Sequence, residues 1–153
     1  MWYIIKICKA TKEDLPQILD LQYLAYQSEA EYLNNYNIPP LKQTLDELEE
    51  EFENKIILKA ISDENKIIGS VRGNLQDNTI YIGKLMVHPD YRNRGLGSKL
   101  LLEIETYFPK SRYELFTSTQ SAHNIRLYEE VGYVAFDQRK VDDKLTFVYL
   151  EKQ

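Results

Sequence analysis

One stretch in the second half of the chain places a strand-like run, a loop with two glycines and a helix-like run in direct succession. The run "TIYIGKLMVHP" (79–89) is rich in β-branched residues and predicts a strand that ends at its proline. Apolar residues then recur at four-residue spacing over 96–108, which predicts a helix. Between the two lies "YRNRGLG" (91–97), which puts Gly95 and Gly97 where the helix begins. This strand–loop–helix order favours a mixed α/β fold.

The residues of this loop suit an anionic ligand. The first amides of a helix have no acceptor inside the helix, and the helix dipole adds partial positive charge there. Glycine lets an anion approach those amides without a side chain in the way. Arg92 and Arg94 add two full positive charges. The loop therefore predicts a site for a phosphate or a pyrophosphate.

Two common phosphate-binding motifs are excluded by single positions. A P-loop needs a glycine five residues before Gly97, where the chain has Arg92, and a lysine followed by serine or threonine, whereas the chain has Ser98 before Lys99. A dinucleotide fingerprint needs a third glycine where the chain has Leu100. The loop must therefore serve another phosphate-bearing ligand.

The rest of the chain continues the alternation of strands and helices. Two runs that meet at the turn "DENK" predict a β-hairpin, and the two prolines of "NIPPL" (37–41) interrupt the helical segment before them. Thr11 with Asp14 and Thr44 with Glu47 have the spacing of capping boxes at two helix starts. The expected order is β-α-α-β-β-β-α-β-α-β-β, with strands at 2–10, 55–62, 66–74, 79–89, 113–119, 133–140 and 144–152 and the last helix at 121–132.

Two motifs in this order resemble those of the GNAT (Gcn5-related) N-acetyltransferase superfamily. The first is R-x-x-G-x-G, here Arg92 to Gly97, and the second is "NIRLYEEVGY" (124–133) on the following helix. The resemblance implies an α/β (mixed α+β) fold with a central, mostly antiparallel mixed sheet, splayed between the fourth and fifth strands and flanked by about four helices. It also implies one acetyltransferase domain over residues 1–153.

The resemblance further implies that acetyl-CoA binds as a co-substrate. In this family the pantetheine arm pairs with the backbone of the fourth strand, and the amides of the glycine loop hold the pyrophosphate. An asparagine on the later helix bonds the CoA arm, although its commoner place in the family corresponds to Ser121. The implied cofactor-binding residues are Leu85, Met86, Val87, Arg92, Asn93, Arg94, Gly95, Leu96, Gly97, Ser98 and Asn124.

The family pattern assigns a catalytic acid but leaves the base open. Tyr128 matches the family tyrosine that protonates the departing thiolate, and a phenol stays protonated at neutral pH. Many relatives carry a glutamate on the fourth strand where this chain has Tyr81. Glu29, Glu31, Glu114 or a chain of water molecules are alternatives for the base.

In this family the first two helices and the segment that connects them form the wall of the acceptor site, so the resemblance places the acceptor there. We expect Tyr26, Glu29 and Tyr81 to bind substrate, with cation–π attraction and carboxylate pairing to an amine. The acceptor is a small-molecule or peptidyl amine. The alternative function is an acyl-CoA-binding regulatory or interaction module with weak or lost catalysis, and another acyl donor also stays open.

Composition limits the partners of the 153-residue chain. A net charge of -5 argues against nucleic acid as a ligand, because phosphate contact needs a basic surface. Lysines interrupt the apolar N-terminal run, so we expect neither a signal peptide nor a membrane span, and a cytoplasmic location. The single cysteine, Cys8, and two distant histidines do not support a metal site. A homodimer is compatible with the family.

Overall fold

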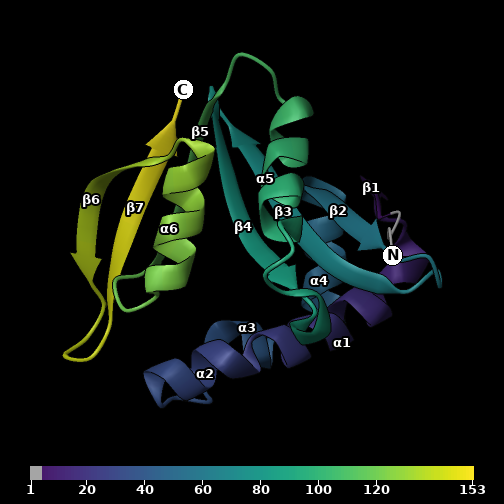
Figure 1. Ribbon diagram of the computed structural model, residues 1–153, viewed down its shortest axis with the longest axis horizontal. Helices are drawn as coiled ribbons and strands as arrows, with labels where there is room; N and C mark the ends of the chain where they lie inside the picture. The colour runs from purple at the N-terminus through teal and green to yellow at the C-terminus, as the bar shows by residue number, and fades with distance from the viewer. Residues whose placement is uncertain (1–4) are drawn as a thin grey trace.

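The computed structural model describes residues 5–153, which form one seven-stranded sheet with helices on both faces (Figure 1). The strand order is β1-β2-β3-β4-β5-β7-β6, antiparallel throughout except for the parallel pair β4–β5. This confirms the expected mixed, mostly antiparallel sheet. The strands are β1 (Lys6–Lys9), β2 (Ile56–Ile61), β3 (Ile67–Gln76), β4 (Thr79–Val87), β5 (Arg112–Ser118), β6 (Val134–Lys140) and β7 (Thr146–Lys152).

Every expected strand is present, although the first expected strand (2–10) extends beyond the described part of the chain at residues 2–4. The helices are α1 (Leu15–Ala25), α2 (Gln27–Leu33), α3 (Pro39–Lys42), α4 (Leu45–Asn54), α5 (Leu96–Thr106) and α6 (Ala122–Val131), with short 3₁₀ turns at Lys12–Asp14 and Pro89–Tyr91. None of the helices within residues 5–153 is long and apolar enough to cross a membrane. The expected cytoplasmic location stays a prediction.

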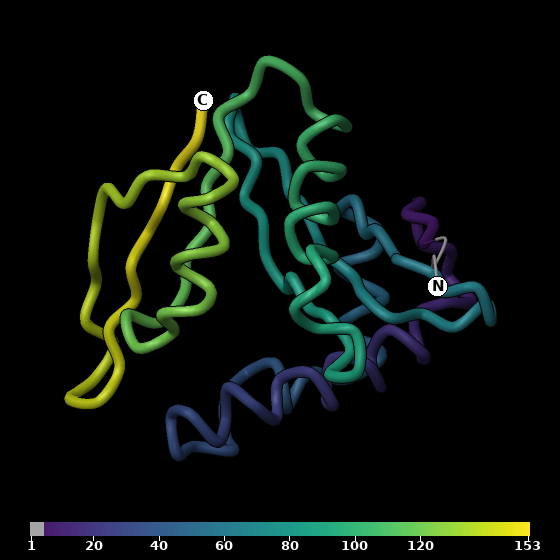
Figure 2. Tube along the Cα trace, viewed as in Figure 1, coloured from purple at the N-terminus to yellow at the C-terminus, as the bar shows by residue number. Residues whose placement is uncertain are grey.

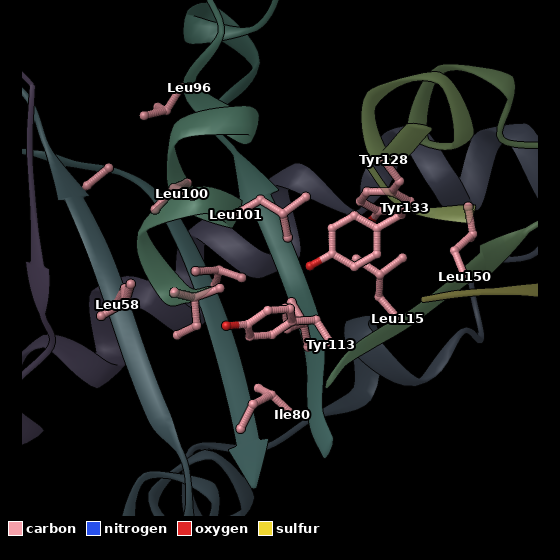
Figure 3. Packing of buried hydrophobic residues seen from close by; sticks show 14 of the residues in the cluster. Leu58, Ile80, Leu96, Leu100, Leu101, Tyr113, Leu115, Tyr128, Tyr133 and Leu150 are labelled. Carbon is pink, nitrogen blue, oxygen red and sulfur yellow. The ribbon is translucent and has the colours of Figure 1, made fainter. Parts of the chain in front are cut away.

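The helices cover the sheet as two layers with separate hydrophobic clusters. One cluster joins α5 and α6 to the sheet and includes Leu100, Ile104 and Tyr128 (Figure 3). The other cluster lies on the opposite face, joins α1 and α4 to the sheet, and includes Ile18 and Leu48. Figure 2 shows the chain running along β4 and turning back through the following loop into α5.

The helix starts follow the expected capping pattern. The Thr44 hydroxyl accepts a hydrogen bond from the Glu47 amide at 3.2 Å, and the Glu47 carboxylate accepts one from the Thr44 amide at 2.9 Å. The Asp14 carboxylate likewise accepts from the Thr11 amide at 2.8 Å. These side chains provide partners for backbone groups that a helix terminus leaves unpaired.

The helical segment before the prolines differs from the expected single helix. It divides at Tyr26 into α1 and α2, and α2 ends at Asn34, whose φ of 50° is left-handed. Pro39 and Pro40 then begin α3 instead of only interrupting a helix, because proline is well suited to the first turn. The described residues therefore form six α-helices, α1 to α6, where about four were expected.

A bulge distorts β4 shortly before its end. The register with β3 shifts between the pairs Arg72↔Gly83 and Ser70↔Met86, so one extra residue lies on β4. Lys84 lies within the bulge and has a left-handed φ of 52°. A left-handed conformation is costly for a residue with a side chain, so the neighbouring structure must hold Lys84 in place.

β4 also separates from β5 well before either strand ends. The two strands form three residue pairs, of which Tyr81↔Glu114 is the last. Beyond this pair β4 stays paired with β3 and β5 stays paired with β7. This separation, called the β4–β5 split below, confirms the splay that the family resemblance implies.

A buried arginine joins the helices of the second layer to the sheet. Arg72 on β3 is 2% exposed, and its guanidinium donates to Glu51 on α4 at 2.6 Å and to Gln22 on α1 at 2.5 Å. Gln43 donates to the same Glu51 carboxylate at 2.6 Å, and Lys55 pairs with it at 2.7 Å. The network therefore fixes α1 and α4 against β3.

We expect Glu51→Gln to lower the free energy of unfolding by about 2 kcal/mol, because it leaves the buried Arg72 charge without its carboxylate. Urea unfolding measures the change, and Glu53→Gln is the control because Glu53 is exposed on the same helix. Burial alone would raise the pKa of Glu51. The opposing effects of Lys55 and Arg72 are together larger, so the pKa of Glu51 lies below its ordinary value.

This lowered pKa gives the effect of Glu51→Gln a defined pH dependence. The stabilisation is present above the ordinary carboxylate pKa and is lost as the pH falls through the lowered one. The difference in the free energy of unfolding between wild type and Glu51→Gln should therefore become smaller at acid pH. A difference that stays constant down to acid pH would contradict this role.

Candidate functional site

The fourth strand has a free edge along the β4–β5 split. Met86 and Val87 pair with Ser70 and Gly69 of β3 on one side, while no strand pairs with them on the other side within the described residues. Leu85 and Val87 pack towards α5, and Met86 packs towards α1 on the opposite face. The backbone of 85–87 can therefore pair with an extended ligand that enters the split.

The loop before α5 has the backbone of an anion site. Asn93 and Gly95 have left-handed φ values of 63° and 79°, one on each side of Arg94. When left-handed residues alternate with residues of negative φ, successive backbone amides point towards one concave side. Lys99 is the first residue of α5 whose amide has a backbone acceptor, Gly95 O at 3.1 Å. Within residues 5–153 the structure records no acceptor for the amides of 95–98.

The two glycines of this loop serve different physical needs. A side chain on Gly95 would meet nothing within 4 Å, so the requirement there is the left-handed backbone. Gly97 has no left-handed φ, but a Cβ there would lie 3.2 Å from Leu127 Cδ2 of α6. Gly97 therefore lets α5 pack closely against α6, a role that the sequence alone did not indicate.

The two arginines of the loop point to different places. The Arg92 guanidinium donates to Ser28 Oγ at 2.8 Å and to the Ala25 carbonyl at 2.9 Å, at the junction of α1 and α2. Arg94 lies over the Tyr91 ring at 5.3 Å. The Arg92 side chain thus connects the glycine loop to the helices that wall the opposite side of the site.

The buried tyrosine of α6 keeps its hydroxyl accessible. Tyr128 is 7% exposed and packs near Tyr133, with ring centroids 6.3 Å apart (Figure 3). No hydrogen bond to its oxygen is recorded in the described chain, and Arg72 Nε is the only fully buried side-chain polar atom there without a partner. The Tyr128 oxygen therefore retains accessible surface. Burial, and then the charge of Glu29, raises its pKa, so the phenol stays protonated.

Asn124 lies one turn before Tyr128 on the same helix. Its amide nitrogen donates to the Thr117 hydroxyl of β5 at 3.3 Å. This bond orients the asparagine across the end of β5. Ser121, at the commoner family position, is buried at the N-terminus of α6.

Two of the three expected acceptor residues interact electrostatically with Tyr128. Burial, and then the charge of Glu29, raises the pKa of both Tyr26 and Tyr128. Burial is the larger cause of the raised pKa of Tyr26. Tyr81 is 41% exposed at the last β4–β5 pair, and no hydrogen bond or ring contact joins it to the others within residues 5–153.

Other groups proposed for the base differ in their surroundings. Glu31 is exposed on α2. Glu114 accepts a hydrogen bond from Arg112 at 2.8 Å, so its carboxylate is already paired. Glu29 is partly buried, and burial raises its pKa although the charge of Lys84 acts in the opposite direction. A raised pKa makes Glu29 a stronger base than an exposed carboxylate.

Lys84 is a site residue that the sequence reasoning missed. It is partly buried and lies in the β4 bulge, where burial and then the charge of Arg72 lower its pKa. Gly83, a glycine inside a strand pattern, was the signal for the bulge. No group of three or more His, Cys, Asp or Glu side chains suited to a metal occurs in the described part.

Comparison with known proteins agrees with this geometry. The family model described as "Acetyltransferase (GNAT) family" matches residues 15–133. The chain belongs to the GNAT acetyltransferase family. A search of curated proteins found no significant match.

Solved structures show the same GNAT fold at low sequence identity. The PaiA N-acetyltransferase of Thermoplasma acidophilum, in complex with coenzyme A, is 20% identical with a TM-score of 0.81, over 98% of this chain and 99% of that one. The ribosomal-protein-S18-alanine N-acetyltransferase of Escherichia coli is 16% identical with a TM-score of 0.78, over 97% of this chain and 92% of that one. A phosphinothricin acetyltransferase of Sinorhizobium meliloti in complex with acetyl-CoA is 15% identical with a TM-score of 0.75, over 97% of this chain and 87% of that one.

We expect Gly97→Val to cost about 1–3 kcal/mol of stability, because the new side chain meets Leu127. Leu127→Ala in the same chain should relieve the clash, so the double variant should lose less stability than the sum of the two single variants. Thermal or urea unfolding of all four proteins measures this coupling. Strict additivity would show that Gly97 is not required by helix packing.

Proposed function

We propose that the protein is an N-acetyltransferase that moves an acetyl group from acetyl-CoA to a primary amine by direct attack in a ternary complex. The observation that carries this proposal is the glycine loop, whose amides at 95–98 have no recorded acceptor and which lies next to the free edge of β4. The family, with relatives bound to coenzyme A and acetyl-CoA, supports the same donor.

In this proposal the backbone holds most of the donor. The amides of 93–98 bind the diphosphate, and the β4 backbone at 85–87 pairs with the pantetheine arm in the β4–β5 split. Left-handed Asn93 and Gly95 support the first role, and the unpaired β4 edge supports the second. Asn124, held by Thr117, extends the contacts to the arm from α6.

The chemistry needs two proton movements. The amine nitrogen attacks the thioester carbonyl, the C–S bond breaks, and the amine loses a proton while the thiolate gains one. Tyr128 supplies the proton to sulfur through its accessible hydroxyl. A β4 amide, that of Val87, stabilises the carbonyl oxygen as it gains charge. Glu29, whose pKa is raised by burial, accepts the proton of the amine, either directly or through water.

The acceptor is a small-molecule or peptidyl amine that reaches the Tyr26 and Glu29 side of the split. The alternative is an acyl-CoA-binding module without turnover, which the Tyr81 substitution for the usual glutamate favours. That alternative would be supported if the protein binds acetyl-CoA but releases no CoA with any amine of a broad panel. A homodimer and a donor other than acetyl-CoA stay predictions.

We expect Tyr128→Phe to lower kcat by about 10²-fold or more while the Kd for acetyl-CoA stays within about twofold, because the phenol acts only as a proton donor. Tyr133→Phe is the matched control. Its hydroxyl donates to Glu105 at 2.8 Å, so it should cost stability and leave kcat near that of wild type. Steady-state kinetics and titration calorimetry measure both. Equal kcat in wild type and Tyr128→Phe would remove Tyr128 from the mechanism.

A further inference from the structure

Four aromatic side chains form a cluster on the C-terminal half of the sheet. The Phe116 ring of β5 lies 4.8 Å from the Phe147 ring and 5.4 Å from the Tyr149 ring of β7, measured between centroids. The Phe136 ring of β6 lies 6.5 Å from that of Tyr149, edge to face. These four residues are called the aromatic face below. Phe116 and Phe136 are 50% and 43% exposed, so the face is open to a ligand.

The strand register explains why these rings share one side of the sheet. Phe116 pairs with Tyr149, and Phe147 lies two residues before Tyr149, so the three side chains point the same way. The register between β6 and β7 shifts at Phe136, which is the extra residue of a bulge. Val148 belongs instead to the hydrophobic cluster of α5 and α6, and α6 covers that opposite side (Figure 1).

The aromatic face continues the side of the sheet that carries α1 and α4. Arg72 on β3 points to those helices, and Asn74 lies two residues further on the same side. Asn74 pairs with Tyr81 of β4, which in turn pairs with Glu114 of β5. Phe116 is two residues beyond Glu114 and is thus also on this side. The glycine loop leads into α5 on the other side, so a donor in the loop and an acceptor on the aromatic face would approach the split from opposite sides.

Phe116 lies where the β4–β5 split opens. Tyr81↔Glu114 is the last residue pair of the two strands, and Phe116 is the next residue of β5 on the same side. Its ring contacts both aromatic rings of β7, so an apolar group beside it would also lie next to the rest of the aromatic face. A ligand can therefore have its amine in the split and its apolar body against these rings.

One arginine beside the aromatic face is paired within the protein. The Arg112 guanidinium lies 5.0 Å from the centre of the Phe136 ring and donates to Glu114 and Glu151, at 2.8 Å in each case. Its charge is thus balanced by carboxylates of the same surface. This pairing makes neither the guanidinium nor the two carboxylates an open site for a charged substituent.

A second arginine occupies a ring that would suit a cation. Arg139 lies 4.7 Å from the centre of the Tyr149 ring and donates to Asp137 at 3.2 Å. The two guanidinium groups already make cation–π contacts with this surface, and they would repel a further cation. The apolar rings of Phe116 and Phe147 therefore provide the surface that remains for recognition.

We propose that the acceptor is a primary amine with an aromatic or similarly bulky apolar group, which packs on the aromatic face while the amine reaches into the β4–β5 split. This inference rests on the proposed function. Contact between the apolar group and the rings removes both surfaces from water, and this burial favours binding. Phe116 is then a specificity-determining residue, since it contacts the body of the acceptor and not the atoms that react.

The first test compares acceptors that differ in the group attached to the same amine. We would measure CoA release with 2-phenylethylamine against ethanolamine, and with the peptide Phe-Gly-Gly against Ser-Gly-Gly. For the pair with the higher turnover, we expect kcat/KM of the aromatic member to exceed that of the hydroxyl member by about 10-fold or more. Equal or better wild-type turnover with the hydroxyl members would overturn the inference and leave the proposed function in place.

Variants of Phe116 provide the second test. Phe116→Thr removes the ring but keeps a residue suited to a strand. It should lower kcat/KM for the aromatic acceptor about 10-fold or more, mainly through KM, and leave the hydroxyl acceptor and the Kd for acetyl-CoA within about twofold. Phe116→Tyr keeps the ring and should retain the preference. Leu75→Thr, which changes a 52% exposed apolar residue on β3, should change neither acceptor class.

A second copy of the chain is the other occupant that an exposed apolar face could have. Sedimentation velocity of wild type and Phe116→Thr over a range of concentrations tests for it. A wild-type dimer that Phe116→Thr converts into a monomer would show that the aromatic face binds another copy, and would overturn the inference.

The remaining outcomes separate the inference from the function on which it rests. Equal losses of kcat/KM for both acceptor classes in Phe116→Thr would show that Phe116 does not select an apolar group. No CoA release from any acceptor, despite binding of acetyl-CoA, would overturn the proposed function and this inference together. A loss confined to the aromatic acceptors, with an unchanged oligomeric state, would support the inference.

Discussion

The early separation of β4 from β5 is the constraint on which the site depends. Three residue pairs hold the two strands together, and beyond Tyr81↔Glu114 β4 stays paired with β3 while β5 stays paired with β7. A strand edge without a partner leaves backbone groups available to a ligand. The separation of β4 from β5 thus provides the proposed donor edge.

Two side-chain connections keep this open arrangement rigid. Arg72 fixes α1 and α4 against β3 through Gln22 and Glu51. Arg92 connects the glycine loop to the end of α1 and the start of α2. Because the second connection links the proposed diphosphate site to the acceptor wall, binding at one side should restrain the other.

Much of the fold was predictable from local sequence signals. Each expected strand, the capping box at Thr44 and the stop of α6 at Gly132, with its φ of 110°, are confirmed. These features depend on residues close in sequence. The site was less predictable because it depends on distant pairs: the need for Gly97 comes from Leu127, and the partners of Arg92 are Ser28 and Ala25. The roles of Tyr128, Tyr26 and Glu29 stay proposals that mutation must test.

The most direct measurement is a crystal structure of the protein with acetyl-CoA. We expect the diphosphate oxygens at about 2.7–3.2 Å from the amide nitrogens of 93–98, the pantetheine arm along the β4 edge at 85–87, and the sulfur next to the Tyr128 hydroxyl. Acetyl-CoA bound elsewhere, or amides of 95–98 engaged by the protein itself with the donor absent from the β4–β5 split, would contradict the central claim.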